Sequence, residues 1–347
     1  MTRSWKMLPF VPAVLALAVS MPMAARAQTQ DAASKKTQSS KVTNVWVIVM
    51  ENHNLTGNNS AAASGKPDIQ GNRLAPYVNG KLMQTSAHAE RYFNPPGSHP
   101  SAPNYIWLEA GTNFGHHSDA LPAEFNITSD KHLVHLMDKA GISWKAYAEP
   151  NYGKSPFQNC PLTSSEVDVS HVGVVYFADD TNDFNSQSSY CIAHVRPYSQ
   201  MAKDLAAHHV ARYNLITPNL CHDGHEGISN CSSNESSNNT ERGDAWLRQN
   251  VPLITNSAEF KKGGILFIVW DEGEDSGIYR DGPIGMFVLS PFAKGGGHSA
   301  YANYIHYDHS STLKTIEEIF GLQPLLGAAA NPATTDLRDL FTNSKLP

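Results

Sequence analysis

Three apolar runs, each followed by polar or turn-forming residues, stand out beyond the N-terminal region. Residues 42–50 (VTNVWVIVM) and 264–270 (GILFIVW) combine β-branched and aromatic side chains without a single charge, and residues 284–290 (IGMFVLS) form the third run. Continuous apolar runs of this length are typical of strands that are buried on both faces of a parallel sheet. We therefore predict three interior strands.

Between these runs, apolar positions recur with helical spacing. The expected helices cover residues 105–110, 130–140, 201–208, 244–256 and 311–320, the last of which is followed by Gly321. Glycine directly after the last periodic residue is a common helix end. Strands that alternate with helices imply a parallel or mixed sheet with right-handed crossovers. The pattern therefore predicts an α/β fold.

Two intervals between these elements, residues 149–185 and 221–241, are polar and rich in turn-forming residues. Such composition is typical of exposed loops, so we predict insertions at the rim of the fold.

A polar stretch also precedes the first strand, at residues 28–41, and cannot bury enough apolar surface to fold by itself. We expect a flexible leader there and a single domain over residues 42–347, a size that α/β architectures can hold in one domain.

The N-terminus carries Arg3 and Lys6, then an apolar run over residues 8–21, then a small-x-small sequence that ends at Ala27. This order predicts a secretory signal peptide at residues 1–27, cleaved near Ala27. A membrane anchor is the alternative. It is disfavoured because prolines interrupt the apolar run, which is shorter than the roughly 20 residues that a spanning helix needs. We therefore expect a secreted or periplasmic protein with no stable membrane insertion.

Export changes the interpretation of the four cysteines. In an oxidising compartment they are candidates for two disulfides rather than for a reduced metal site, and none has C-x-x-C spacing. Three pairings are possible. We favour Cys160 with Cys191 and Cys221 with Cys231, because each pair closes a polar loop region, but the sequence does not decide between the pairings.

The net charge bears on whether the protein binds nucleic acid. The formal net charge is -6 and the sequence pI is near 6.2, without a basic stripe. Proteins that follow a nucleic-acid backbone carry such a stripe. We therefore expect no nucleic-acid binding, while the oligomeric state is left open.

Acidic and amide side chains follow two of the predicted strands. Glu51-Asn52 ends the first run, and Asp271-Glu272 ends the second. In open α/β sheets the ends of the strands form the ligand crevice, and oxygen ligands from two strand ends can share one divalent cation. Solvated loop carboxylates or helix caps are the alternative for each cluster alone. The coincidence of two clusters favours a cation site, whose metal the oxygen ligands do not identify.

A candidate nucleophile lies in the segment Ser101-Ala102-Pro103-Asn104-Tyr105. Ser101 directly precedes a predicted helix start, where backbone N–H groups point toward an anion. A serine hydroxyl there can attack phosphorus once a metal lowers its pKa, with the Asn104 amide bound to a phosphoryl oxygen. An N-cap serine without chemistry is the commoner case, so position alone does not decide.

The sixteen histidines supply further candidates, since imidazole can bind metal, donate to phosphate or protonate a leaving oxygen. Two stand out because carboxylates flank them. His225 lies with Asn219 and Asp223 in PNLCHDGHEG, and His309 follows Asp308. The other histidines in polar clusters are His99, His116, His117, His222 and His306.

Six segments in a fixed order carry a family resemblance: VWVIVMENHN, HPSAPNYIWLEAG, ITPNLCHDGHEG, GDAWLRQNVPLI, FIVWDEGE and DHSSTLKTIEEIFGL. Together they resemble the bacterial and fungal phosphoesterase family of acid phosphatases and phosphatidylcholine-type phospholipases C, within the alkaline-phosphatase-like superfamily. The resemblance covers nearly all of the mature chain. It implies a three-layer sandwich with a mostly parallel central sheet and helices on both faces, and a divalent metal cofactor.

The resemblance also implies residue roles. Glu51 and Asn52 match the first metal ligands, Ser101 matches the metal-bound nucleophile, and Asp271 with Glu272 matches the later acidic ligand pair. The segment around Ser101 is also similar to the nucleophile turn of nucleotide pyrophosphatases, where the asparagine helps to bind phosphate. This likeness implies the same role for Asn104.

The chain departs from the family in two places. Asn219 and Asp223 occupy the positions of an Asp-x-x-x-His metal pair in two-metal relatives, which points toward one metal. We expect His225 and His309 to contact phosphate, and Asn219, Asp223 and Asp308 to support a second site or the surroundings of the first. His171 follows Ser170 where relatives show a Lys-His-Asn-Pro-Phe segment, and phosphate contact is the role that the resemblance implies for it.

The resulting expectation is a metal-dependent phosphoric monoester hydrolase of the acid phosphatase type, acting on a phosphorylated small molecule through a phosphoserine. A phospholipase C-type phosphodiesterase is the alternative. It is disfavoured because the chain is short and lacks the long C-terminal extension found in many such enzymes. A catalytically inert exported binding protein for phosphorylated ligands is a third possibility, although such a protein has no need of a nucleophile beside a metal.

Overall fold

The computed structural model describes residues 1–2, 41–55, 69–225, 231–273 and 282–347. Residues 39–347 form one compact unit. The predicted signal peptide and leader therefore lie almost entirely outside the described residues. No described helix is both long enough and apolar enough to span a membrane.

A central sheet of eight strands has the order β5-β4-β6-β1-β7-β8-β2-β9. The strands from β5 to β7 in this order are parallel, β8 pairs antiparallel with both β7 and β2, and β9 pairs parallel with β2. A separate pair, β3 and β10, is parallel. The bounds are β1 Val45–Met50, β2 Ala87–Ala89, β3 Tyr92–Phe93, β4 Trp144–Ala148, β5 Val195–Pro197, β6 Tyr213–Thr217, β7 Ile265–Trp270, β8 Met286–Leu289, β9 Tyr301–Asn303 and β10 Tyr307–Asp308.

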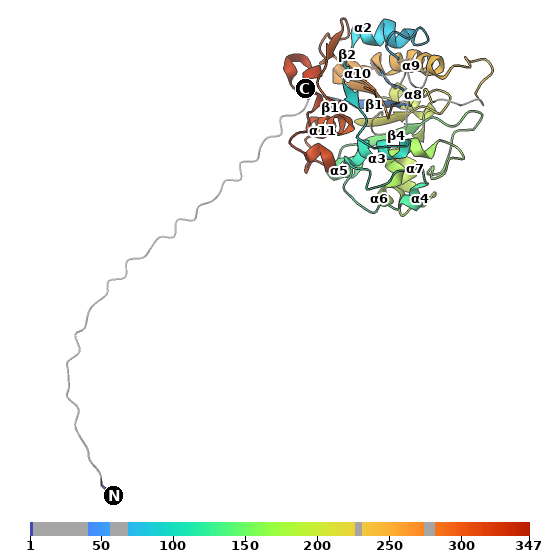
Figure 1. Ribbon diagram of the computed structural model, residues 1–347. Coiled ribbons are helices and arrows are strands. Elements are labelled where there is room, and N and C mark those ends of the chain that lie inside the picture. The colour runs from blue at the N-terminus through green and yellow to red at the C-terminus, as the bar shows by residue number, and fades with distance from the viewer. Residues whose placement is uncertain (3–40, 56–68, 226–230, 274–281) are drawn as a thin grey trace, which may run out of the picture. The chain divides into compact units, whose positions relative to one another are not determined.

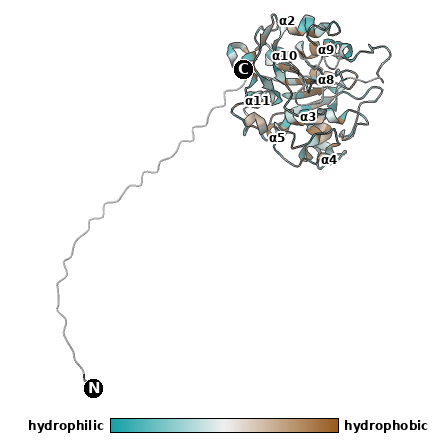
Figure 2. Ribbon diagram, viewed as in Figure 1, coloured by the Kyte–Doolittle hydropathy of each residue, from teal (hydrophilic) through white to brown (hydrophobic). Residues whose placement is uncertain are grey.

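The two strongest predicted strands lie side by side in the middle of this sheet. Every side chain of β1 and β7 is buried, as expected for continuous apolar runs, and the hydropathy colouring marks this interior as hydrophobic (Figure 2). The parallel register pairs Val45 with Ile265 and Met50 with Trp270. The two strands therefore end at the same level, which brings the polar residues that follow them together.

Helices cover both faces of the sheet. Figure 1 shows α9 and α10 on one side of β1 and β4, with α3 and α5 on the other. The α-helices are α2 Met83–Thr85, α3 Ser101–Ala110, α4 Pro122–Phe125, α5 Leu133–Lys139, α6 Ala178–Thr181, α7 Ser189–His194, α8 Ser199–Ala206, α9 Asn239–Thr255, α10 Ala258–Gly263 and α11 His309–Phe320. Short turns of other helix types are η1 Val78–Leu82, η2 Val169–His171, η3 Gly173–Tyr176, η4 Gly327–Ala330, η5 Leu337–Leu340 and η6 Thr342–Ser344.

Four helices begin earlier than their apolar periodicity predicts: α8 and α11 by two residues, α3 by four and α9 by five. The Asn238 side chain accepts from the Glu241 N–H and so starts α9 at Asn239. Helix α3 starts at Ser101 itself, so the serine lies in the first helical turn rather than before it. Polar side chains can occupy a first turn, and apolar spacing alone does not detect them.

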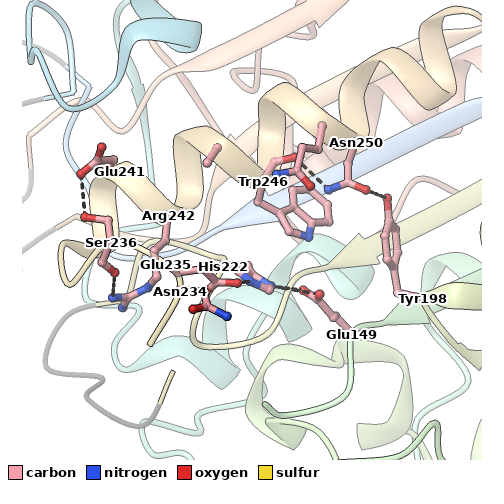
Figure 3. A pocket seen from close by; sticks show the side chains of 12 residues that line it. Glu149, Tyr198, His222, Asn234, Glu235, Ser236, Glu241, Arg242, Trp246 and Asn250 are labelled. Atoms are coloured by element: carbon pink, nitrogen blue, oxygen red, sulfur yellow. Dashed lines mark hydrogen bonds and ion pairs between the residues drawn. The ribbon is translucent and has the colours of Figure 1, made fainter. Parts of the chain in front are cut away.

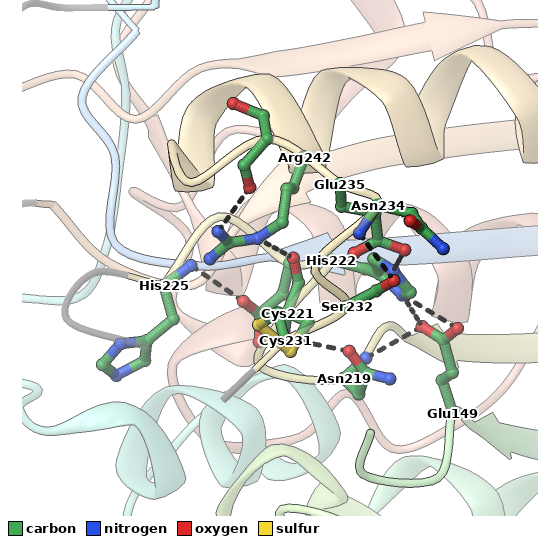
Figure 4. Close-up of a disulfide and its surroundings, with 12 residues drawn as sticks. Glu149, Asn219, Cys221, His222, His225, Cys231, Ser232, Asn234, Glu235 and Arg242 are labelled. Carbon is green, nitrogen blue, oxygen red and sulfur yellow. Dashed lines mark hydrogen bonds and ion pairs between the residues drawn. A yellow bond between two sulfur atoms is a disulfide. The ribbon is translucent and has the colours of Figure 1, made fainter. Parts of the chain in front are cut away.

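Both favoured disulfides are confirmed: Cys160 with Cys191 and Cys221 with Cys231, with Cα–Cα distances of 5.5 and 5.6 Å. The second closes the loop that carries His222 and His225 (Figure 4). The Arg242 Nε also donates to the Cys221 carbonyl at 2.8 Å. The cross-link and this hydrogen bond together fasten the loop to the first turn of α9.

Helix α3 buries an acidic residue, Glu109, beneath the sheet. Its side chain is fully buried, near the main chain of Val134 and the hydroxyl of Tyr213. Burial raises the pKa of this carboxyl to about 8. The folded protein therefore binds a proton at Glu109 more tightly than the unfolded chain does.

The free energy of unfolding of the wild type should decrease between about pH 5 and 8. We expect this decrease to be smaller in Glu109→Gln, which has no carboxyl group to titrate. The stabilisation from the bound proton is complete below the ordinary glutamate pKa and is lost as the pH rises through the folded value. Over this range the free energy of unfolding of the variant should gain on the order of a few kcal/mol relative to wild type. Urea unfolding measures it, with Glu124→Gln on the surface of α4 as the control. An equal pH dependence in wild type and Glu109→Gln would contradict the prediction.

Candidate active site

The polar residues after β1 and β7 meet at the shared end of these strands. Glu51 and Asp271 are fully buried, and the Asn52 N–H donates to Asp271 Oδ1 at 3.2 Å. Asn52 has a φ of 53°, a left-handed conformation that asparagine adopts more readily than most residues. The structure thus brings together the two polar clusters, Glu51-Asn52 and Asp271-Glu272, that the sequence places after β1 and β7.

Ser101 faces this cluster from the first turn of α3. Its Oγ donates to Glu51 Oε2 at 3.1 Å, and the Tyr105 hydroxyl, one turn along the same helix, donates to Glu51 Oε1 at 2.7 Å. The Ala102 N–H donates to Asp119 Oδ1 at 2.9 Å. The start of α3 is therefore held in place by carboxylates on two sides, with the serine hydroxyl between them.

The Glu272 carboxylate contacts two polar side chains, Asn104 and His99. Its Oε2 accepts from Asn104 Nδ2 at 2.8 Å and lies 2.8 Å from His99 Nδ1. The Asn104 amide also donates to the Ser98 carbonyl at 2.9 Å. Asn104, which the sequence assigned to a phosphoryl oxygen, is thus joined to the acidic cluster through Glu272.

His171 lies between two of the carboxylates. Its Nε2 is 3.3 Å from Glu51 Oε1, and its Nδ1 is 3.5 Å from Asp223 Oδ2. The ring stacks on Tyr105 at 5.2 Å between centroids, and the ring of His225 lies 6.4 Å beyond it. Two histidines predicted to bind phosphate therefore flank the same cluster as Ser101.

Close packing of carboxylates shifts their proton affinities. Burial, together with the charges of Asp271, Asp223 and Glu272, raises the pKa of Glu51 well above its usual range. Burial and the charge of Glu272 raise the pKa of Asp271 to about 8. Burial alone would lower the pKa of His171, but its ion pair with Asp223 and the neighbouring aspartates raise it to about 9. Without a cation, these buried carboxyl groups therefore hold protons at pH values where a free carboxyl is ionised.

The unpaired atoms of the cluster match the needs of a divalent cation. Asn52 Oδ1 and Asp271 Oδ2 are buried and have no hydrogen-bond partner among the residues that the structure describes. Buried oxygens without a partner are costly, and a cation would satisfy them while offsetting the repulsion between the carboxylates. Carboxylate, amide and hydroxyl oxygens form a donor set for a hard or borderline metal. The residues present therefore fit such an ion.

Three other residues singled out in the sequence lie at the margin of this cluster. His309 is fully buried, and its Nε2 donates to the Asp271 carbonyl at 2.6 Å; burial lowers the pKa of its ring to about 4. Asp308 caps α11 by accepting from the N–H groups of the first turn. The Asn219 amide donates to the Pro150 carbonyl and its oxygen accepts from the Cys221 N–H. These contacts of the Asp308 and Asn219 side chains are therefore to nearby main-chain groups. None of these contacts is to the carboxylate cluster, by which we mean Glu51, Asp223, Asp271 and Glu272.

A separate pocket of about 470 Å³ opens beside the disulfide-closed loop (Figure 3). His222 and Glu149 lie on its wall and are 2.9 Å apart, with Trp246 and Tyr198 on another side. None of the residues that line it belongs to the carboxylate cluster. The loop thus presents His222 to this pocket and the next residue, Asp223, to the cluster.

Sequence reasoning missed Tyr105 and Asp119 as members of the site and did not single out His99. Tyr105 follows Ser101 by four positions, which places both on one face of a helix, and this spacing could have indicated a shared partner. The contacts of Asp119 and His99 join loops to α3 and to β7. No periodicity in the sequence signals such contacts.

The Phosphoesterase family matches residues 72–323, which is most of the chain. The chain is 27% identical over 295 residues to the phosphatidylinositol-3-phosphatase of Mycobacterium tuberculosis, covering 84% of this chain and 81% of that protein. It is 23% identical to a probable acid phosphatase of Kluyveromyces lactis, covering 66% of this chain and 50% of that protein. The chain thus spans only about half the length of this fungal relative.

Among solved structures, a protein of the alkaline phosphatase superfamily from Vibrio parahaemolyticus superimposes with a TM-score of 0.50 at 10% identity, covering 85% of this chain and 72% of that one. This likeness confirms the predicted α/β fold with its mostly parallel sheet. Fold and family together define a phosphoester hydrolase. The chain belongs to the Phosphoesterase family.

Proposed function

We propose that this protein is a metal-dependent acid phosphatase that cleaves phosphoric monoesters through a phosphoserine at Ser101. The observation that carries the proposal is the position of Ser101 Oγ, 3.1 Å from Glu51 at the first turn of α3 and beside a cluster of buried oxygens without partners. The similarity to a probable acid phosphatase and to a phosphatidylinositol-3-phosphatase supports the reaction class.

In this proposal five residues hold a divalent cation: Glu51, Asn52, Ser101, Asp271 and Glu272. When bound, the cation lowers the pKa of the serine hydroxyl and offsets the negative charge that gathers on the phosphoryl oxygens. His309 acts behind this set as a positioning residue, because its Nε2 donates to the main chain of Asp271 and no part of the ring is exposed.

The chain's own groups account for the two transfer steps. Ser101 Oγ forms a bond to phosphorus as the bond from phosphorus to the leaving oxygen breaks, and the serine proton passes toward Glu51 Oε2, the oxygen to which it is already hydrogen-bonded. His225, half-buried beside His171, donates a proton to the leaving alcohol. A water oxygen then attacks phosphorus opposite Ser101 Oγ and gives a proton back to His225, while the bond from phosphorus to Oγ breaks and Glu51 returns its proton to the serine; the product is inorganic phosphate.

Positive charge and amide donors orient the phosphoryl group. His171 Nε2 lies 3.3 Å from Oε1 of Glu51, the residue that also accepts from Ser101, and the neighbouring aspartates raise the pKa of its ring in the metal-free protein. Asn104 lies one helical turn from Ser101, and in this proposal its Nδ2, which donates to Glu272 Oε2 at 2.8 Å, turns toward a phosphoryl oxygen. A substrate phosphate that meets His171, His225 and the amide of Asn104 is held in line with the serine hydroxyl.

We further propose that the protein acts outside the cytoplasm. Its four cysteines form two disulfides, as expected for an oxidising compartment. The N-terminal sequence pattern of residues 1–27 supports export by a cleaved signal peptide.

We expect the oxidised mature protein to hydrolyse p-nitrophenyl phosphate faster at about pH 5 than at about pH 8, and to hydrolyse p-nitrophenylphosphorylcholine at least about tenfold more slowly. Dialysis against EDTA should abolish both activities, and a divalent metal should restore them. Turnover of the diester ahead of the monoester would assign a phosphodiesterase instead. Binding of phosphate esters without any release of product would assign a binding protein.

A further inference from the structure

Two histidines at the start of α5 and an aspartate in α6 lie close together. His132 directly precedes α5, His135 lies in its first turn, and Asp179 lies in α6. His132 Nε2 is 3.0 Å from Asp179 Oδ1, and His135 Nδ1 is 2.8 Å from Asp179 Oδ2. All three donor atoms lie within 4.8 Å of one another.

These distances are close to those of a metal site. Ligand atoms of a tetrahedral zinc site stand about 3.3 Å apart, because each lies about 2.0 Å from the metal. A small outward shift of the Asp179 carboxylate would admit an ion between the three donors. The three side chains also differ in exposure: that of His132 is fully buried, whereas those of His135 and Asp179 are 23% and 37% exposed. Solvent can therefore reach the remaining coordination positions.

A second carboxylate faces the outer nitrogen of each imidazole. His132 Nδ1 lies 3.6 Å from Asp180 Oδ2, and His135 Nε2 lies 3.7 Å from Asp130 Oδ2. In metal sites a ligating histidine commonly donates its other N–H to such a carboxylate, which fixes the ring and strengthens the ligand. Within the described part of the chain, His132 Nδ1, Asp180 Oδ2 and His135 Nε2 are buried atoms without a hydrogen-bond partner. A metal-bound, neutral ring would place its proton on this outer nitrogen.

We propose that His132, His135 and Asp179 form a second metal site, separate from the active site, that takes a zinc ion. Two imidazoles and one carboxylate match the ligand preference of zinc, and water completes the coordination. The ion would join α5 to α6. Helix α5 packs against α3, and the His132 ring stacks on Phe177 just before α6 at 4.0 Å between centroids. The site therefore stabilises the layer that supports the nucleophile helix, and it contributes no group to the reaction.

Metal content measures the proposal directly. Full-length mature protein is stripped with EDTA, saturated with zinc, desalted and analysed by mass spectrometry for zinc per chain. We expect His135→Ala to lose one equivalent relative to wild type, with at least about a hundredfold weaker zinc binding at this site in calorimetry. Asp179→Asn should show the same loss, which guards against a folding defect specific to one variant.

Two further variants separate this site from the active site. Asp271→Asn removes a proposed active-site ligand, so in that background the remaining zinc equivalent should disappear when His135→Ala is added. His208→Ala disrupts a surface histidine 2.7 Å from Glu259 and should leave the zinc content unchanged. If His135→Ala and Asp179→Asn, both folded by circular dichroism, bound as much zinc as wild type, the cluster would be an ion pair between two helices and no metal site.

Discussion

Replacing Ser101 with alanine is expected to lower kcat for p-nitrophenyl phosphate by at least about 10³-fold. The serine hydroxyl is the group of this helical turn that could form the proposed phosphoserine, because the residues that follow it are Ala102 and Pro103. Its Oγ donates to Glu51 Oε2, so the substitution removes one hydrogen bond and leaves the rest of the cluster in place. Steady-state kinetics at about pH 5 measure the effect.

Two controls make this result specific. Ser118→Ala changes an exposed serine in the neighbouring loop and should leave kcat within about twofold of wild type. Acid quenching during turnover of a ³²P-labelled ester should trap label on the wild type and none on Ser101→Ala. Retention of label and of turnover in the alanine variant would move the nucleophile to another residue.

The second large effect is expected at Asp271. Asp271→Asn should weaken binding of the active-site metal by at least about a hundredfold, since changes to residues that only support ligands already cost about 10 to 100-fold. Asparagine preserves the size of the side chain and can still accept from the Asn52 N–H. The variant loses the charge at Oδ2, a buried oxygen that has no hydrogen-bond partner.

The same substitution should stabilise the folded protein when no metal is bound. Above the raised pKa of Asp271, about 8, its charge repels that of Glu272, so removing this charge should raise the Tm measured in EDTA at about pH 9. Asp183→Asn, at an exposed position, is the matched control and should change neither quantity. A variant with wild-type activity and metal affinity would show that Asp271 is not a ligand.

The central sheet was predictable where the sequence contains continuous apolar runs. β1 and β7 are fully buried, so every side chain must be apolar and the pattern is unambiguous. β4 and β6 are equally central to the parallel part of the sheet, but their sequences, WKAYA and YNLIT, mix polar and apolar residues. Lys145 in β4 pairs with Asp204, which lets a charged side chain lie in a strand that the pattern does not reveal.

The candidate site was predictable at the ends of those same strands and at the nucleophile segment. Glu51 and Asp271 follow buried strands directly, so their meeting follows from a parallel register. The partners of these residues come from loops far away in the sequence. His171 reaches Glu51 and Asp223 from a short 3-10 turn, and Asp119 reaches the start of α3 from another loop. Their positions depend on tertiary packing that local pattern does not encode.

The pairing of β1 affects when the central sheet can form during synthesis of the chain. β1 is the first strand of the sheet in the chain, yet its two neighbours are β6 and β7, and β7 ends only at Trp270. A nascent chain therefore carries β1 without β6 until Thr217 and without β7 until Trp270, and long-range pairing of this kind slows folding. No N-terminal fragment that stops before β7 contains both carboxylate clusters. The proposed metal site can therefore form only after β7 is complete, when Glu51 first meets Asp271.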